Sequence, residues 1–273
     1  MLHCMAVRVT VLASGSRGNC AVVSSSAGSI LVDAGLSCRE TLKRMRAVGE
    51  DPRHLKAIVI SHEHADHVAG LEVLARKLKI PVYITQDTYE SWRKSTRDAE
   101  GRLAELEQRE HFHAGYSFSV GDITVNSFTT SHDAADPCGF TFKAEGIKIG
   151  IVTDLGAIKP NVVYALRGCD GLLIESNHDL EMLRNGPYPW MVKQRVMSRV
   201  GHLSNSALAE FLASEYDGGA AFLVLLHLSE QNNYPELARQ AAYKALGNRL
   251  NLFQESALAV AFQDKPLQPL CLG

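Results

Sequence analysis

The sequence predicts an α/β protein in which two β-sheets face each other. Short apolar segments bounded by glycine and polar residues alternate with helical patterns along the chain, which is typical of this fold class. The order of strands and loops in the first half of the chain also recurs in the second half. Two similar halves predict two similar sheets, related by a pseudo-twofold axis.

The first half begins with a strand over 7–12 and a loop of small residues over 14–19. Strands over 20–24 and 29–33, a helix over 38–48 and a strand over 57–61 follow. The next segment, 66–78, is predicted to be one amphipathic helix. Its apolar residues recur at helical spacing, as Leu71, Leu74, Ala75 and Leu78.

The second half repeats this order with a strand over 123–128, a loop over 131–138 and a strand over 139–143. A further strand ends at Asp154, and another covers 171–175. Asp154 therefore occupies the position that Asp33 has in the first half. A pseudo-twofold arrangement would bring both carboxylates to one edge of the two sheets, where we expect the chemistry.

The remaining segments complete the alternating pattern. The charged segment 89–110 is predicted to be a solvated helix or a mobile excursion. A helix over 204–214, a strand over 220–226, a helix that begins near Asn233 and a strand over 257–262 follow. Asn233 and Glu236 have the spacing of a capping box. No linker-like composition divides the chain, so we expect a single domain over 1–273.

The composition of the chain excludes several classes of function. The 273 residues include 28 Lys and Arg against 30 Asp and Glu, so any nucleic-acid binding must come from a local basic patch. No apolar run has the ~18 residues of a membrane span, and no secretion signal is recognised, so we expect a cytoplasmic protein without a membrane partner. The six cysteines form no C-x-x-C pair, which argues against a thiolate zinc site.

The strongest functional signal is the string HEHADH at 62–67, which follows an apolar strand. Given the composition of the chain, chance would produce this pattern on the order of 10⁻³ times. His62 and His64 point the same way in an extended turn, while Asp66 and His67 are redirected at the start of a helix. Four such ligands can address two adjacent metal ions.

Three further candidate ligands follow apolar runs, namely His132, Asp154 and His227. A lone histidine after a strand is often structural, so His132 and His227 have both interpretations. Asp154 is better placed, because a carboxylate can bridge two cations ~3.5–4 Å apart. Asp33 is expected behind the ligands, where it would bind the far nitrogen of a ligand histidine and fix its tautomer.

In order, these motifs resemble those of the metallo-β-lactamase superfamily over nearly the whole chain. The resemblance implies an αββα sandwich with a dinuclear centre. It places His62, His64, His132 and Asp154 around one metal, and Asp66, His67, Asp154 and His227 around the other. The strings GSRGNC, SHDAADP, ESNHD, YPWMVKQRVMSRVGHLSN and HLSEQNN are similar to the YycJ/WalJ branch, a nuclease or phosphodiesterase relative of RNase Z and RNase J.

Related phosphodiesterases keep a histidine that is not a metal ligand in a motif like GHLSN, which here contains His202. This side chain would stabilise the phosphorane or protonate the leaving oxygen; the alternative is a structural residue ahead of a helix cap. Arg195 and Arg199 are candidate phosphate contacts, although surface helices also carry such charges for solubility. In the glycine-rich loop, the candidate anion contacts are Ser16, Arg17 and Asn19, and a tight turn explains the glycines equally well.

The sequence therefore predicts a dinuclear hydrolase of phosphodiester bonds, with Asp66 and His202 as catalytic residues. The branch resemblance implies a DNA nuclease, and 5′-to-3′ exonuclease action is the expected form of this activity. His and Asp ligands accept two Zn²⁺ or Mn²⁺ ions, and iron as well. One rival interpretation is a hydrolase of small thioesters, lactones or small phosphodiesters. A second is a diiron redox protein, which would usually have a carboxylate at the position of His64. A third is a non-catalytic binding module. A homodimer would confine the substrate.

Overall fold

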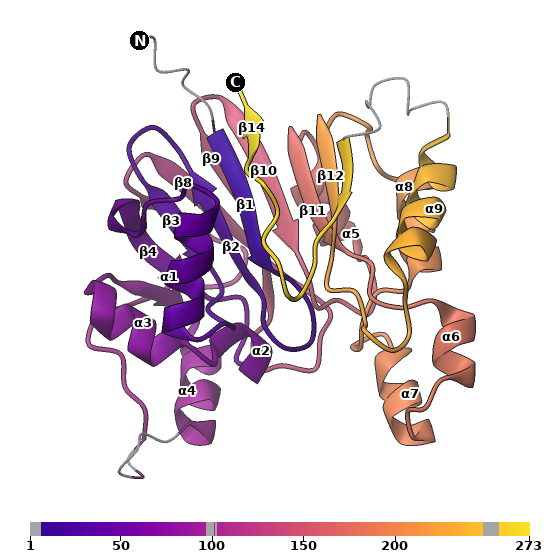
Figure 1. Cartoon of the computed structure of the whole chain (residues 1–273), viewed down its shortest axis with the longest axis horizontal. Coiled ribbons are helices and arrows are strands. Elements are labelled where there is room, and N and C mark those ends of the chain that lie inside the picture. Colours follow the sequence, from indigo (N-terminus) through magenta and orange to yellow (C-terminus); the bar gives the residue numbers. More distant parts are fainter. Residues whose placement is uncertain (1–6, 97–100, 102, 248–256) are drawn as a thin grey trace.

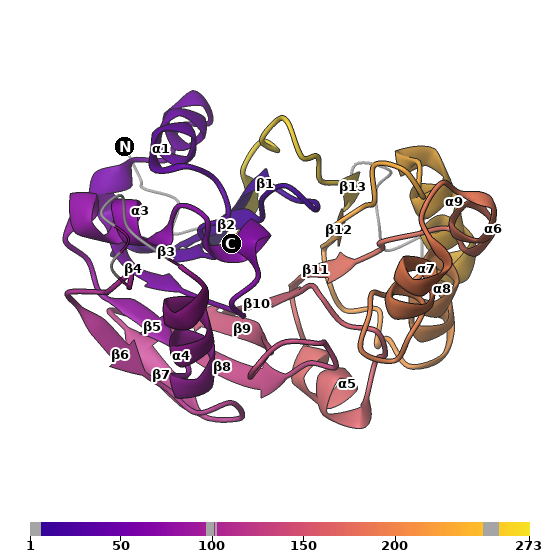
Figure 2. The ribbon, with the colours of Figure 1, turned by 90° about the horizontal axis from the view of Figure 1, so that it is seen from below.

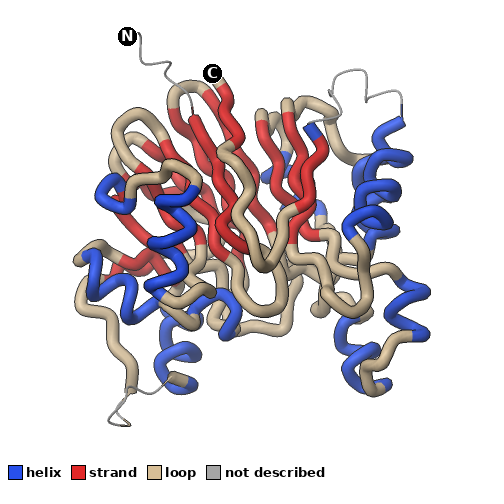
Figure 3. Tube along the Cα trace, in the orientation of Figure 1, coloured by secondary structure: helices blue, strands red, loops and turns tan. Residues whose placement is uncertain are grey.

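Two mixed β-sheets of seven strands each pack face to face, with helices on their outer sides (Figures 1 and 3). The computed structural model describes residues 7–96, 101, 103–247 and 257–273. The predicted αββα sandwich is therefore confirmed. None of the helices in these ranges has the length and apolar character needed to cross a membrane.

The first sheet has the strand order β14-β1-β2-β3-β4-β5-β6. Its strands are β14 (Leu270–Leu272), β1 (Val7–Ala13), β2 (Cys20–Ser24), β3 (Ser29–Val32), β4 (Leu55–Val59), β5 (Val82–Ile84) and β6 (Arg109–His111). The second sheet has the order β13-β12-β11-β10-β9-β8-β7. Its strands are β13 (Leu258–Val260), β12 (Phe222–Leu226), β11 (Gly171–Glu175), β10 (Ile147–Val152), β9 (Cys138–Ala144), β8 (Ile123–Thr129) and β7 (Ser117–Val120).

The internal repeat is confirmed in the strand pairing. Strands β1 to β4 pair antiparallel, antiparallel and then parallel, and β8 to β11 do the same. The correspondence extends further than the sequence predicts, because each sheet continues with two more parallel pairings and has an antiparallel strand at its other edge. The short strands β5, β6, β7 and β14 had no counterpart in the prediction.

The helices are α1 (Cys38–Ala47), α2 (Ala65–Val68), α3 (Leu71–Leu78), α4 (Gln86–Ser95), α5 (Pro160–Leu166), α6 (Leu180–Asn185), α7 (Trp190–Val196), α8 (Asn205–Ser214) and α9 (Pro235–Leu246). A 3₁₀ turn, η1 (Pro52–His54), precedes β4. Seen from below, α1 and α3 lie on one side of the sandwich, and α8 and α9 lie at the opposite end (Figure 2). Strands β2, β3, β11 and β12 are buried along their whole length, as expected of strands that are covered on both faces.

The single helix predicted over 66–78 is wrong. It is divided into α2 and α3 at Gly70, whose backbone N–H donates to the Ala34 carbonyl 2.8 Å away. A Cβ atom at Gly70 would lie 1.9 Å from the Leu36 carbonyl oxygen, so only glycine allows this contact. The break holds the 62–67 loop against the turn that follows Asp33.

Two other predictions need correction. In the segment 89–110, α4 is not a solvated helix, because Tyr89 and Trp92 are buried, and β6 follows; positions 97–100 and 102 lie outside the described residues. Asn233 does not cap α9, whose N-cap is Tyr234 without a side-chain hydrogen bond. The buried Asn233 amide instead donates to the carbonyls of Ser176 and Asn177, so its role is structural.

Candidate metal centre

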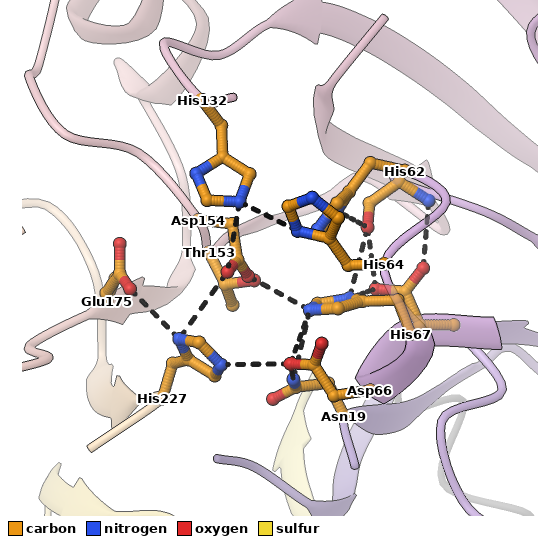
Figure 4. A network of polar contacts seen from close by, with 12 residues as sticks. Asn19, His62, His64, Asp66, His67, His132, Thr153, Asp154, Glu175 and His227 are labelled. Carbon is orange, nitrogen blue, oxygen red and sulfur yellow. Dashed lines mark hydrogen bonds and ion pairs between the residues drawn. The ribbon is translucent and has the colours of Figure 1, made fainter. Parts of the chain in front are cut away.

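The predicted ligands converge on one edge of the sandwich (Figure 4). Asp33 follows β3, the 62–67 loop follows β4, Asp154 follows β10 and His227 follows β12. Within each sheet these strands run in the same direction, so their carboxyl ends meet at one edge. The edge expected to carry the chemistry is therefore the edge at which these side chains gather.

Three histidines form the first cluster. The nitrogen atoms that His62, His64 and His132 can offer to a metal all lie within 4.8 Å of one another. The His132 Nε2 is 3.2 Å from the His64 Nδ1. The buried His62 Nε2 has no hydrogen-bond partner among the described residues. An unpartnered buried nitrogen beside two other imidazoles fits a cation that binds all three.

Asp66, His67 and His227 form the second cluster. The Asp66 Oδ2 is 3.4 Å from the His67 Nε2 and 3.3 Å from the His227 Nε2. Asp154 lies between the two clusters, with its Oδ2 3.1 Å from the His67 Nε2 and its Oδ1 3.7 Å from the His132 Nε2. Both predicted ligand sets are thus brought together, and Asp154 is in the position of a shared ligand.

Asp33 lies behind the second cluster. Its Oδ2 is 2.8 Å from the His67 Nδ1 and accepts a hydrogen bond of 2.9 Å from the Ser61 hydroxyl, while its Oδ1 accepts one of 2.8 Å from the Ser61 backbone N–H. With Nδ1 held in this way, the other nitrogen of His67 points at Asp66 and Asp154. This is the geometry expected of a carboxylate that fixes the tautomer of a ligand histidine.

Glu175, the last residue of β11, is a site residue that the sequence analysis missed. Its Oε1 lies 2.8 Å from the His202 Nδ1 and 3.0 Å from the His227 Nδ1. Its Oε2 accepts hydrogen bonds from the backbone N–H groups of Leu155 and Leu203. The available signal was a charged residue at the end of the apolar strand GLLIE, the same signal that singled out Asp154.

His202 lies beside the ligands. Its Nδ1 is 3.5 Å from the Asp154 Oδ1, and its ring centroid is 5.1 Å from those of both His132 and His227. Ser204, two residues later, is the N-cap of α8, so His202 precedes the helix. Because Glu175 occupies Nδ1, Nε2 is the nitrogen left for a substrate.

Burial and neighbouring charges shift the pKa values of the ligand residues in opposite directions. Burial would raise the pKa of Asp154, but His227 and His67 hold it well below its usual range. Burial would lower the pKa of His67 and of His227, but neighbouring carboxylates, with Asp154 foremost, raise both well above the usual range. Protonated histidines thus balance the carboxylates. Divalent cations would supply the same positive charge and leave these imidazoles neutral, as metal ligands must be.

His62 and His202 differ in environment. Burial, with His67 nearby, lowers the pKa of His62 well below its usual value, so its imidazole stays neutral. Burial also acts against the charged form of His202, but Glu175 raises the pKa of this histidine. Burial would raise the pKa of Glu175, but His202 and His227 together hold it at about 2. Of these two histidines, His62 and His202, the latter is therefore the one whose protonated form is favoured.

The candidate phosphate contacts lie in two places. In the glycine-rich loop, Ser16 and Arg17 are exposed, and Arg17 pairs with Glu230. Asn19 is buried instead, and its amide donates to the Asp66 Oδ2 over 3.0 Å. Arg195 pairs with Asp133, and Arg199 is exposed beyond the end of α7. Of these two arginines only Arg195 belongs to the helix, because α7 ends at Val196.

A family model described as a beta-lactamase superfamily domain matches residues 29–228. The chain belongs to the metallo-β-lactamase superfamily. Exodeoxyribonuclease YycJ of Bacillus anthracis is 37% identical over 242 residues, which cover 89% of this chain and 90% of the relative. Exodeoxyribonuclease WalJ of Streptococcus pneumoniae is 36% identical over 239 residues, 88% of each chain. The resemblance to the YycJ/WalJ branch of the superfamily is thus confirmed.

A solved structure gives the same fold. The metallo-β-lactamase fold protein YhfI from Bacillus subtilis is 19% identical, covers 96% of this chain and 99% of its own, and superimposes with a TM-score of 0.66. At this identity the likeness concerns the fold alone. The fold implies divalent metal binding, and the two donor clusters, with Asp154 between them, fit that implication.

Proposed function

We propose that this metallo-β-lactamase superfamily member is a dinuclear metal-dependent phosphodiesterase that degrades DNA as a 5′-to-3′ exonuclease. The observation that carries the proposal is His202, held by Glu175 beside the two clusters that meet at Asp154. The names of the YycJ and WalJ relatives support DNA as the substrate. Zn²⁺ and Mn²⁺ are the proposed metals, because both accept His and Asp ligands.

Some of these residues would bind the metal ions, and others orient the side chains that do. We assign His62, His64, His132 and Asp154 to one ion, and Asp66, His67, Asp154 and His227 to the other. When bound, two divalent ions supply Lewis acidity and lower the pKa of water. Asp33 orients His67, and Glu175 orients His202 and His227.

His202 is the proposed proton donor to the departing oxygen. Its Nδ1–H donates to Glu175, which fixes the ring, and the negative charge of this carboxylate favours the protonated imidazole by raising its pKa. A proton delivered at this step avoids a basic alkoxide leaving group, and positioned general acids contribute about 10²–10⁴-fold in rate. Asp66 is the proposed second catalytic residue, because its carboxylate contacts His67 and His227 in the second cluster.

The test is a nuclease assay with Mn²⁺ and Zn²⁺ in parallel, on single- and double-stranded DNA and RNA labelled at either end. We expect metal-dependent cleavage of DNA that releases product from the 5′ end, no activity in Asp66→Ala, and a kcat lower by about 10²–10⁴-fold in His202→Ala with its metal content retained. A protein that holds two ions and leaves every nucleic acid intact would contradict the proposal and redirect the search to small phosphodiesters and thioesters. The cytoplasmic location and the homodimer stay predictions.

A further inference from the structure

Helix α7 presents its apolar side chains outward. The exposed fraction is 63% for Trp190 and 81% for Met191, and Val192 is exposed as well. The buried residue of this helix is Lys193, whose ammonium donates to the Arg184 carbonyl at the end of α6 over 2.7 Å. An amphipathic surface helix has the reverse arrangement, with its apolar face against the core. Such an outward apolar face marks a contact surface for another molecule.

Cationic side chains share this surface with the apolar ones. Arg195 lies one helical turn after Met191, on the same face. Arg199 and Val200 follow the helix, and both are exposed. We call the set formed by Trp190, Met191, Val192, Arg195, Arg199 and Val200 the α7 surface.

The α7 surface is joined to the metal centre by several contacts. The Arg195 guanidinium binds Asp133, the neighbour of His132, with an Nη2 to Oδ1 distance of 3.1 Å. The Asp133 backbone N–H donates to the Val200 carbonyl over 3.0 Å. The His132 Nδ1 lies 3.0 Å from the Gly201 carbonyl oxygen. Figure 1 shows α7 below the strands, at the same end of the molecule as α2.

Close packing fixes the segment that follows α7. A Cβ atom at Gly156, two residues after Asp154, would lie 2.4 Å from the Ser198 carbonyl oxygen. The backbone from 198 to 201 thus rests directly on the turn that carries Asp154. A molecule that lies along the α7 surface would therefore enter the metal centre beside His132 and His202.

We propose that the α7 surface binds the single-stranded part of a DNA substrate next to the phosphate that is cleaved. This inference rests on the proposed function. A base stacks on the Trp190 indole, and backbone phosphates contact Arg195 and Arg199. Aromatic platforms combined with basic side chains are how proteins bind single strands without sequence preference, because every base has a π face and every linkage a charge.

A second copy of the chain fits this surface less well. In a twofold dimer the same patch meets itself, so Arg199 would come close to the arginines of the other copy, while Arg195 is already paired with Asp133. Like charges in contact across an interface disfavour association. A single strand satisfies both features of the surface, since it offers apolar base faces together with negative charge.

The experiment uses the natural tryptophans. The chain has two, and Trp92 is 1% exposed while Trp190 is 63% exposed, so quenching by a strand reports on Trp190. The metal-loaded protein is titrated with a short phosphorothioate oligothymidylate, which resists cleavage, and the Kd is also measured by anisotropy of a labelled strand. We expect saturable quenching, and a Kd about 5- to 100-fold weaker in Trp190→Ala. Trp190→Phe should retain most of the affinity.

Two further variants sharpen the test. Arg199→Gln should lower the slope of log Kd against log salt by about 0.7, the value for one lost phosphate contact on a single strand. Tyr116→Ala is the matched control, because this aromatic residue is 69% exposed and lies in the loop before β7, at the far end of the second sheet from α7. We expect it to bind the strand like the wild type.

The outcomes separate the inference from the proposed function. Quenching that depends on Trp190 supports the inference even if no nucleic acid is cleaved, in which case the nuclease proposal fails alone. Normal strand affinity in Trp190→Ala overturns the inference and leaves the nuclease proposal standing. Sedimentation that shows a wild-type dimer and a Trp190→Ala monomer of equal strand affinity also overturns it, in favour of a second copy of the chain.

Discussion

Glu175→Gln is the substitution that tests the site most directly. It keeps the shape of the side chain but replaces a carboxylate, which accepts four hydrogen bonds, with an amide that has one acceptor oxygen. That oxygen can face the two histidines or the backbone N–H groups of Leu155 and Leu203, but not both pairs. The NH₂ group, which is itself a donor, then faces the two N–H donors of the other pair, and that pair is left without an acceptor.

The magnitude follows from burial and charge. Glu175 is fully buried, and removal of one partner from a buried charged network costs about 3–5 kcal/mol in the free energy of unfolding. His202 loses the acceptor that holds its Nδ1–H, so its ring is free to turn and its pKa falls. We expect kcat to drop by about 10²–10⁴-fold, the contribution of a positioned general acid.

The assay compares kcat on a labelled DNA strand, metal content by mass spectrometry, and urea unfolding of the metal-free protein. Glu63→Gln is the matched control, since this carboxylate lies in the ligand loop but its Oε1 accepts only from the Ala135 backbone N–H, a bond that an amide oxygen keeps. Because the Glu63 Oε2 is buried without a hydrogen-bond partner, the control is compared on kcat, which we expect to stay at the wild-type value. Wild-type kcat and stability in Glu175→Gln would refute the reasoning.

Asp33→Ala should weaken metal affinity by about 10–100-fold, measured by competition with a chelator, because His67 loses the partner of its Nδ1; unchanged affinity would mean that Asp33 does not position a ligand. Burial lowers the pKa of His178 to about 4, so only the unfolded chain binds a proton there as the pH falls below about 6.5. The contribution of this residue to the free energy of unfolding is therefore fully present above that pH, and we expect it to fall by about 2 kcal/mol between about pH 7 and 5. The measurement is urea unfolding with a chelator present, and His178→Gln should reduce the loss. Chelation should abolish nuclease activity and lower the thermal midpoint, and added metal should restore both, since ions at about 1,000 times Kd add about 4 kcal/mol to stability; a midpoint that does not respond would contradict metal binding.

Much of the fold could be predicted because it depends on local pattern. Strands β2 and β11 have the predicted limits, since each is an apolar run bounded by polar residues or glycine. Strands β5, β6, β7 and β14 have three or four residues each, too few to establish a periodicity. The break at Gly70 was missed for another reason. The helical pattern continues through it, and the hydrogen bond to Ala34 that interrupts the helix is a tertiary contact.

The site residues also differ in whether local sequence or tertiary packing determines their contacts. The 62–67 loop concentrates its donors in six positions, so sequence spacing alone singles it out. The partners of Glu175 are 27 and 52 residues away in His202 and His227, and no local spacing connects them. Asn19 was expected to contact phosphate, but its amide reaches Asp66 across the turn of the glycine-rich loop. The packing of the two sheets determines which polar groups contact each other.

The backbone at the strand ends explains how the repeat builds one centre. Asp33, Asp154 and His227 have φ values of 60°, 58° and 55°, a left-handed conformation that costs non-glycine residues roughly 1–2 kcal/mol. Each follows a strand whose carboxyl end reaches the site, and the turn directs the side chain back over the edge of its sheet. Asp33 and Asp154 share this geometry through the repeat but differ in surroundings, because the loop after β4 supplies three histidines and Asp66, whereas the loop after β11 supplies one histidine, His178, after Ser176 and Asn177. The first half of the chain therefore provides the 62–67 donors and the second half provides His132, Asp154, Glu175, His202 and His227, so neither half can form the centre without the other.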